Sequence, residues 1–235
     1  GLLRKGAKSR TADQLSAELD FIGGVLNAVA GTDSSNVSAE FVKKDVVKGL
    51  DLLADVMLSP IFPQDEVTKL LKQRLDGIKS AKDQAQGVIG QYYNSYLYGK
   101  HPYGLRTLGE RASVARLNSN SLKKYWHEHL NPSDLCISIV GDISPAEVKD
   151  LANEWIDLKK RKGIKPPKMD IAKPSKIIRS EIVKKGKEQA HIVLGFLGTT
   201  VKSPDHYKLS VLNHILSGQG GRLFITLRDK MSLAY

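Results

Sequence analysis

A strongly basic, proline-bearing stretch after residue 158 most constrains how this chain can fold. From Lys159 to Lys187 it holds 12 Lys or Arg residues against two acidic ones. The whole chain has 36 basic and 25 acidic residues, which leaves 24 basic against 23 acidic elsewhere. A stretch with one sign of charge and several prolines repels itself and stays extended. We therefore predict a solvated linker here and not one charged face of a folded domain.

The linker divides the chain into two predicted domains. We place the first domain at residues 1–158, the linker at 159–176 and the second domain at 177–235. The length of 235 residues fits one or two domains. Because the chain opens on Gly1 and stops soon after a second helix of the second domain, we expect the first domain to lack amino-terminal residues. We expect the second to lack carboxy-terminal ones.

Short apolar runs and helical patterns occur in blocks along the chain. Residues 25–41 predict a β-hairpin with one buried face, and three compact apolar runs predict further strands at 135–140, 177–183 and 191–196. Blocks of strands and helices are typical of the α+β class. We predict two similar domains of antiparallel-rich sheet, each with helices packed on one face.

Several helices have clear start signals or an apolar stripe. Residues 11–22 read as a helix, and Ser144 with Glu147 forms a predicted capping box at the start of another. In the helix after Asp45 we expect one buried stripe, made of Val46, Leu50, Leu53 and Met57.

Composition excludes several classes of protein. No apolar run approaches the roughly 18 residues of a membrane-spanning helix. The single cysteine, Cys136, excludes an intrachain disulfide framework and a cysteine-rich zinc module. The basic linker has no interleaved aromatic residues on which bases could stack, so we expect no nucleic acid partner.

Two local motifs invite a chemical interpretation that their context does not favour. His127 and His129 are two residues apart on a predicted helix, so they point to different faces and do not suit one zinc ion. The loop Ser217–Gly221 is rich in glycine, but it follows a helix and lacks the Lys-Ser/Thr ending of a phosphate loop. We interpret it as a flexible loop in which the backbone approaches something closely.

Arg228 and Tyr235 are seven residues apart, two helical turns if the helix persists. A guanidinium and a phenol that converge on one point suit an oxyanion or a substrate carbonyl. From the spacing alone, an exposed arginine and a half-buried tyrosine are the favoured interpretation of the pair.

The succession of motifs resembles one family across the whole chain. These motifs are Gly1-x-x-x-Lys5-Gly6 with Arg10-Thr11, Leu53–Val56 with Pro60-x-Phe62-Pro63, Tyr98–Gly104, Val140–Ile143, and Gly221–Phe224 through Leu227–Lys230 to Leu233–Tyr235. They resemble the pitrilysin and insulysin family of zinc metallopeptidases, with a fold like that of LuxS and the processing peptidases.

The resemblance implies a two-part enzyme. In that family two halves close around a peptide, one half carries zinc on an inverted His-x-x-Glu-His motif, and the other often lacks metal. The metal-free half contributes an Arg and a Tyr seven residues apart, and Arg228 and Tyr235 match that pair. The glycine-rich loop of related subunits suggests that Gly218, Gly220 and Gly221 contact substrate.

The resemblance also places the family's metal ligands on this sequence. The second histidine falls at Gly1, and the glutamate of the long helix falls at Gly77, beside Asp76. Glycine has no side chain to coordinate a metal, and zinc needs three protein ligands here. We therefore expect no metal in this chain and zinc in a partner half.

These inferences lead to one functional hypothesis and its alternatives. The resemblance implies a non-catalytic, substrate-binding half that is inactive without a zinc-bearing homologue, with which it forms a heterodimer around a peptide. The alternatives are a scaffold or assembly subunit of the same family, an active protease whose motif lies before Gly1, and a nucleic-acid-binding protein. A homodimer stays open, and the resemblance alone suggests a bacterial periplasm or envelope.

Overall fold

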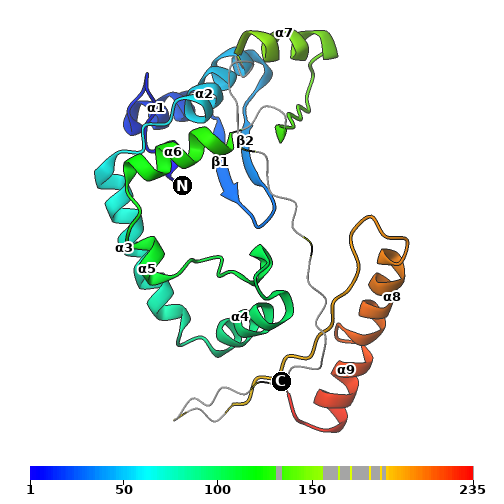
Figure 1. Cartoon of the computed structure of the whole chain (residues 1–235). Helices are drawn as coiled ribbons and strands as arrows, with labels where there is room; N and C mark the ends of the chain where they lie inside the picture. Colours follow the sequence, from blue (N-terminus) through cyan, green and yellow to red (C-terminus); the bar gives the residue numbers. More distant parts are fainter. Residues whose placement is uncertain are drawn as a thin grey trace. The chain divides into compact units, whose positions relative to one another are not determined.

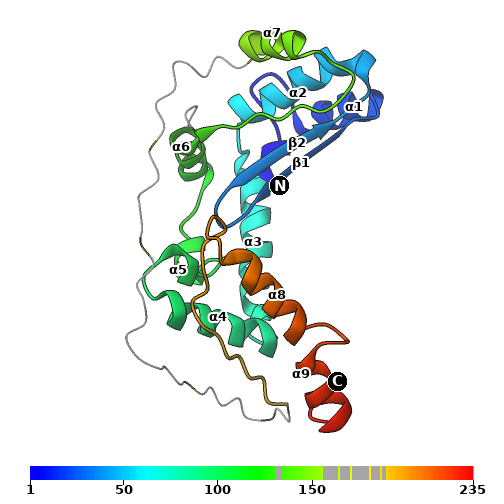
Figure 2. The ribbon, with the colours of Figure 1, turned by 90° about the vertical axis from the view of Figure 1, so that its right-hand side faces the viewer.

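A computed structural model describes residues 1–130, 134–155, 164, 170, 180, 186 and 189–234 of the chain (Figures 1 and 2). The chain divides into two compact units, Gly1–Ile171 and Ala172–Tyr235. The predicted domain boundaries near 158 and 176 fall outside the described residues, as does nearly all of the predicted linker. Ile164 is described, and its amide donates a 2.9 Å hydrogen bond to the carbonyl of Glu128.

The first unit is mostly helical with one hairpin. In chain order its elements are η1 (Leu2–Arg4), α1 (Ala12–Phe21), β1 (Val25–Ala30), β2 (Ser35–Glu40), η2 (Lys43–Asp45), α2 (Val46–Leu58), α3 (Gln64–Ala81), α4 (Ala85–Tyr98), η3 (Pro102–Gly104), α5 (Arg111–Val114), α6 (Ser119–His129) and α7 (Pro145–Trp155). The second unit contains α8 (His206–Leu216), α9 (Arg222–Phe224) and η5 (Ile225–Lys230). No helix in the described ranges is both long and apolar enough to cross a bilayer.

Local signals start two helices where the sequence predicts them. The Thr11 hydroxyl accepts a hydrogen bond from the Gln14 backbone amide, and the Gln14 side chain accepts one from the Thr11 backbone amide. These two bonds form a capping box at the start of α1. At the start of α7, the Ser144 amide donates to the Glu147 carboxylate at 2.8 Å and Ser144 accepts from the Glu147 amide. The bond to Ser144 lowers the pKa of Glu147. The capping box predicted at Ser144 is thus confirmed, and the one at Thr11 was not predicted.

The hairpin is the one sheet of the described residues. β1 and β2 pair antiparallel, with Val25 opposite Glu40 and Ala30 opposite Ser35. Figure 2 shows α1 and α2 beside these strands, and both helices contact them. The core joins the hairpin, the helices and the start of α3 through a buried apolar cluster of Leu3, Ala7, Leu15, Leu19, Ile22, Leu26, Leu52, Val56, Phe62 and Val67.

The buried stripe of α2 differs from the prediction. The helix buries Gly49, Leu52 and Val56, whereas the predicted residues are only partly buried. The helix is apolar on more than one side, so periodicity alone allowed two neighbouring stripes. Packing of α2 against both α1 and β2 selects the stripe that is buried.

Two of the predicted strands are not formed. Residues 135–140 and 191–196 are described and have no strand partner, and 177–183 lie almost wholly outside the described residues. Ile139 and Phe196 are 37% and 81% exposed. An apolar run becomes a strand only when a second strand satisfies its backbone groups, and the pattern of one segment does not supply that strand. The fold is α+β, but its described sheet has only the two strands of the hairpin.

Candidate functional site

The glycine-rich loop closes a tight turn between α8 and α9, two successive helices in Figure 1. Ser217 ends α8, and both its amide and its hydroxyl donate to the carbonyl of Asn213, at 2.8 and 2.7 Å. Gly218 follows with φ +79°, a conformation that L-residues other than glycine rarely adopt. The Gly221 amide then donates to the Gly218 carbonyl at 3.0 Å.

Gly221 is required by this turn itself. A Cβ atom there would lie 2.1 Å from the carbonyl oxygen of Ser217, far inside van der Waals contact. Gly220 has open space around it, and both Gly218 and Gly220 are exposed. The close backbone approach predicted for the loop therefore occurs within the chain at Gly221. Gly218 and Gly220 are the glycines whose backbone faces solvent.

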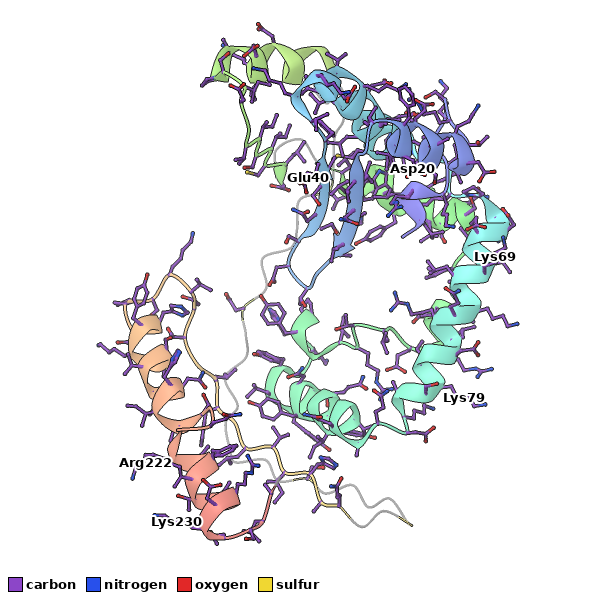
Figure 3. The ribbon with its side chains drawn as sticks, turned by 180° about the vertical axis from the view of Figure 1, so that it is seen from behind. Asp20, Glu40, Lys69, Lys79, Arg222 and Lys230 are labelled. Carbon is purple, nitrogen blue, oxygen red and sulfur yellow. The ribbon has the colours of Figure 1, made fainter. Side chains whose placement is uncertain are left out.

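Arg228 lies on η5, a π-helical stretch that directly continues α9. Figure 3 labels Arg222, the first residue of α9, and Lys230, the last residue of η5. The guanidinium carbon of Arg228 lies 4.6 Å from the centroid of the Phe224 ring, within the range of a cation–π contact. The side chain is otherwise exposed, and among the described residues it forms no ion pair. The guanidinium is thus held against a ring while its donors stay available.

The helix ends before it reaches Tyr235. Lys230 is its last residue, Ser232 has φ +54°, and the Leu233 amide bonds back to the carbonyl of Leu227 at 2.8 Å. The helix therefore does not persist for two turns after Arg228, because the backbone turns at Ser232. Tyr235 lies outside the described residues, so its distance from Arg228 stays a prediction.

The two positions assigned to missing metal ligands are in the first unit. Gly1 is exposed at the start of η1, and Gly77 lies in α3 with no atom within 4 Å of a Cβ placed there. Asp76, its neighbour, lines a groove on α3. Within the described ranges, no three His, Cys, Asp or Glu side chains are grouped so that they could hold a metal ion.

His129 is explained by its own helix. Its Nδ1 lies 2.9 Å from the carbonyl oxygen of Tyr125, and the two rings stack with centroids 3.9 Å apart. These contacts fit the interpretation of His127 and His129 as a polar helix end and not as a metal pair.

A network of ion pairs around Arg10 joins three parts of the first unit. The sequence analysis did not predict this network. Arg10 is 14% exposed; its Nε lies 3.1 Å from both Glu18 oxygens, its Nη1 lies 3.0 Å from Asp55, and it also pairs with Asp51. Burial acts to lower the pKa of Arg10, but hydrogen bonds to Asp55 and Asp51 outweigh it and raise the pKa. The sequence feature that could have indicated this network is the i,i+4 spacing of Asp51 and Asp55 on α2, which places two carboxylates on one face. Their partner, Arg10, is distant in the sequence.

Glu18 of this network has a second cation, Lys48. A hydrogen bond from Lys48, and then contacts with Arg10, lower the pKa of Glu18. The network therefore ties the start of the chain, α1 and α2 together by charge as well as by the apolar core.

The Tyr98–Gly104 motif makes contacts that its sequence did not predict. His101 caps η3 by accepting the Tyr103 amide on Nδ1, and its ring meets the Tyr103 ring edge-on at 4.6 Å. The Tyr103 hydroxyl donates a 2.5 Å hydrogen bond to Asp33 in the hairpin turn, which raises the pKa of Tyr103. The tip of the hairpin is thereby fastened to the segment that follows α4.

Comparison with known proteins gives matches over nearly the whole chain. Residues 2–111 match the family model described as insulinase (peptidase family M16), and residues 116–235 match that of the peptidase M16 inactive domain. A Bacillus subtilis protein named as an uncharacterized zinc protease, YmxG, is 31% identical over 98% of this chain. A Rickettsia felis protein named as an uncharacterized zinc protease is 27% identical over 98% of it. The chain spans about half of these relatives, 56% of each.

Solved structures share the fold. A peptidase M16 inactive domain from Pseudomonas fluorescens superposes with a TM-score of 0.82 at 22% identity, over 97% of this chain and 56% of that one. A protease from Helicobacter pylori superposes with a TM-score of 0.72 at 20% identity, over 98% and 56%.

Proposed function

Because the chain belongs to the insulinase family of peptidases, peptidase family M16, we propose that it is the non-catalytic, substrate-binding half of a two-part zinc metalloendopeptidase. The observation that carries the proposal is the match of residues 116–235 to the inactive domain of the family. In this proposal the chain encloses a peptide and contributes Arg228 and Tyr235 to the zinc site of a partner half.

The donors of the chain do not fit the family's zinc. Glycines stand at both positions that the resemblance assigns to ligands, and Gly77 in particular has room for a side chain that it lacks. The neighbouring carboxylate, Asp76, shares its groove with Lys72 and Lys79, whose charges disfavour a cation. A zinc site needs three protein ligands. We therefore place the metal chemistry in the partner and assign none of it to this chain.

Arg228 suits a role in trans. Its guanidinium offers several fixed donors, and the ring of Phe224 orients it without using them. A donor aimed at a developing oxyanion is worth about 3–4 kcal/mol in a water-poor site. The exposed Gly218 and Gly220 let a peptide approach the backbone nearby.

The hairpin offers a place for an extended peptide. Each of its strands has one edge without a strand partner within the described ranges. An extended peptide can add to such an edge through backbone hydrogen bonds. Val25 and Val29, both exposed on β1, would then supply apolar contacts on one face of the added strand.

Peptide cleavage by the reconstituted pair tests the proposal. Neither chain alone should cleave, and the mixture with a zinc-bearing family member from the same genome should. Arg228→Ala should lower kcat by about 100- to 1,000-fold, and Tyr235→Phe should lower it as well. Lys230→Ala, an exposed cation on the same helical stretch, is the matched control and should leave the rate unchanged. Equal rates for all variants would contradict the proposal.

Metal analysis provides a second, independent test. The purified chain should hold no stoichiometric zinc after dialysis, and its partner should hold one per chain. One tightly bound zinc per copy of this chain would overturn the non-catalytic assignment and favour an active protease instead.

The alternative is a scaffold or assembly subunit of the same family. The observation that favours it is the exposed apolar side of α8, where Tyr207 and Val211 lie open to solvent. A scaffold would still bind the zinc-bearing partner, but Arg228→Ala and Tyr235→Phe would leave the partner's peptide cleavage unchanged. The same kinetic experiment therefore separates the two functions.

A further inference from the structure

A groove between α3 and α5 is the feature of the first unit that neither the family match nor the proposed function explains. It has a volume of about 430 Å³. Figures 1 and 2 both show α5 beside the middle of α3, and the two helices contact each other. The lining combines apolar side chains with an excess of positive charge.

The floor of the groove is apolar. Leu71 and Leu75 come from α3, and Leu117 comes from the segment that follows α5. Leu71 packs against the main apolar cluster, so this part of the lining is fixed by the core. α5 is fixed in turn by its buried Val114. Val114 is buried and packs closely against Gly109, which has φ +81°. A Cβ atom on Gly109 would lie only 2.8 Å from Val114 Cγ2.

Three cations line the groove. Lys72 and Lys79 are seven residues apart on the same face of α3, and Arg111 reaches the groove from α5. In the described structure none of the three forms an ion pair. Lys69 on the same helix differs, because it pairs with Glu66 at 2.7 Å. Figure 3 shows Lys69 and Lys79 well separated along α3.

The single carboxylate in the groove, Asp76, does not neutralise these cations. It lies four residues after Lys72 and three before Lys79, yet it forms an ion pair with neither in the described structure. The formal charge of the lining is therefore +2. An occupant with negative charge and apolar side chains would complement both parts of the lining.

We propose that this groove binds a polypeptide segment that carries both acidic and leucine-like side chains. The carboxylates of the segment contact Lys72, Lys79 and Arg111, and its apolar side chains contact the leucines of the groove. Lys72 and Lys79 are separated by about 10 Å along the helix axis, more than a single carboxylate or phosphate can bridge. Carboxylates spaced along a peptide match that separation. No aromatic side chain lines the groove, so nothing stacks on nucleic acid bases.

The site is independent of the proposed action in trans, because it lies within the first unit and needs no partner. It is tested on the whole chain alone by fluorescence anisotropy. The probe is a short labelled peptide that alternates Glu, Leu and Ser, compared with one that carries Gln for Glu and one that carries Ser for Leu. The first probe should bind, and each of the other two should bind markedly more weakly.

Variants of the groove identify where the peptide binds. Lys72→Gln, Lys79→Gln and Arg111→Gln should each weaken binding by roughly two- to fivefold, the range for an exposed ion pair. Leu117→Ser should weaken it by roughly fivefold through lost apolar burial. Asp76→Asn should tighten binding, because it removes the only carboxylate that faces the ligand. The five side chains replaced in these variants are all exposed. Unchanged unfolding midpoints would show that the variants fold.

Matched controls exclude an effect of net charge. Arg74→Gln removes an exposed cation from α3 outside the groove, and Asp13→Asn removes an exposed carboxylate from α1; both should leave binding unchanged. Binding that follows net charge in the controls would overturn the proposal. So would absence of binding by the first probe, or binding that is lost only when the four basic residues at 159–162 are replaced by Gln. Equal competition by a single-stranded oligonucleotide would assign the groove to polyanions in general and would also overturn it.

Discussion

The two units of the chain differ in how far they bury similar apolar residues. In the first unit, Leu52 and Val67 are fully buried within one cluster that joins η1, α1, α2 and the hairpin. In the second unit, Leu212 on α8 is 48% exposed and Phe196 is more exposed still. Both units have helical or alternating apolar patterns in the sequence. The difference teaches that a pattern predicts which face must be covered but not which element covers it.

Truncation of a leucine should give the largest difference between the units. Leu52→Ala should lower the free energy of unfolding by about 2–5 kcal/mol, because it leaves a cavity in a packed core. Leu212→Ala, the matched change in α8, should cost less than about 1 kcal/mol because its side chain is already half exposed. Urea denaturation followed by circular dichroism measures both. Equal losses would show that α8 is buried as deeply as α2 and would remove the contrast.

Loss of Arg10 should be the next largest effect. Arg10→Ala should lower the free energy of unfolding by about 1–3 kcal/mol, because carboxylates of α1 and α2 would lose their shared partner. Arg74→Ala, an exposed arginine without an ion pair in the described structure, should change stability by less than about 0.5 kcal/mol. The same denaturation experiment compares them. Similar small changes in both would mean that the network contributes little beyond the core.

The network also predicts how stability depends on pH. Contacts with Lys48 and Arg10 hold the pKa of Glu18 below its ordinary value. The stabilisation by ionised Glu18 is therefore present above the unfolded-state pKa of about 4.3 and is lost as the pH falls through the lower folded-state value. Thermal unfolding at a series of pH values should show a smaller decline of Tm in acid for Glu18→Gln than for the parent chain. Asp13→Asn, the control, should follow the parent curve.

Two glycines should give effects of opposite sign in the two units, and the gain at Gly77 should be the smallest effect of all. Gly77→Ala should stabilise the chain by about 0.5–1 kcal/mol, because α3 has open space there and alanine loses less entropy in a helix. Gly221→Ala should destabilise the turn between α8 and α9, because its Cβ would collide with the Ser217 carbonyl. Hydrogen exchange of the backbone amide at position 221 should accelerate in that variant, while Gly220→Ala should leave it unchanged. Destabilisation by Gly77→Ala would show that glycine is needed in α3.

Local chemistry was predictable where the interacting residues are close in the sequence. The capping box at Ser144 and the hairpin of residues 25–41 depend on neighbours within a few positions, and the structure has both as expected. The family and the α+β class also followed from motifs in order along the chain.

Features that depend on distant residues were not predictable in this way. Arg10 meets partners on α2 more than 40 positions away. The spacing of Asp51 and Asp55 places two carboxylates on one helix face but does not indicate Arg10 as their partner. The runs at 135–140 and 191–196 have the composition of strands, but strand formation depends on a partner that the pattern does not contain. At the candidate site, Arg228 is described and exposed, while the role of Tyr235 and of the exposed glycines stays a prediction.

The bond from Tyr103 to Asp33 gives the hairpin a support at its tip, while α1 and α2 pack along its strands. A two-stranded hairpin by itself is marginal in water. Because these contacts already order the hairpin backbone, binding of an added strand would not include the entropy cost of ordering the hairpin. If the hairpin binds an extended peptide as proposed, this support makes it a rigid template, although it is only two strands wide.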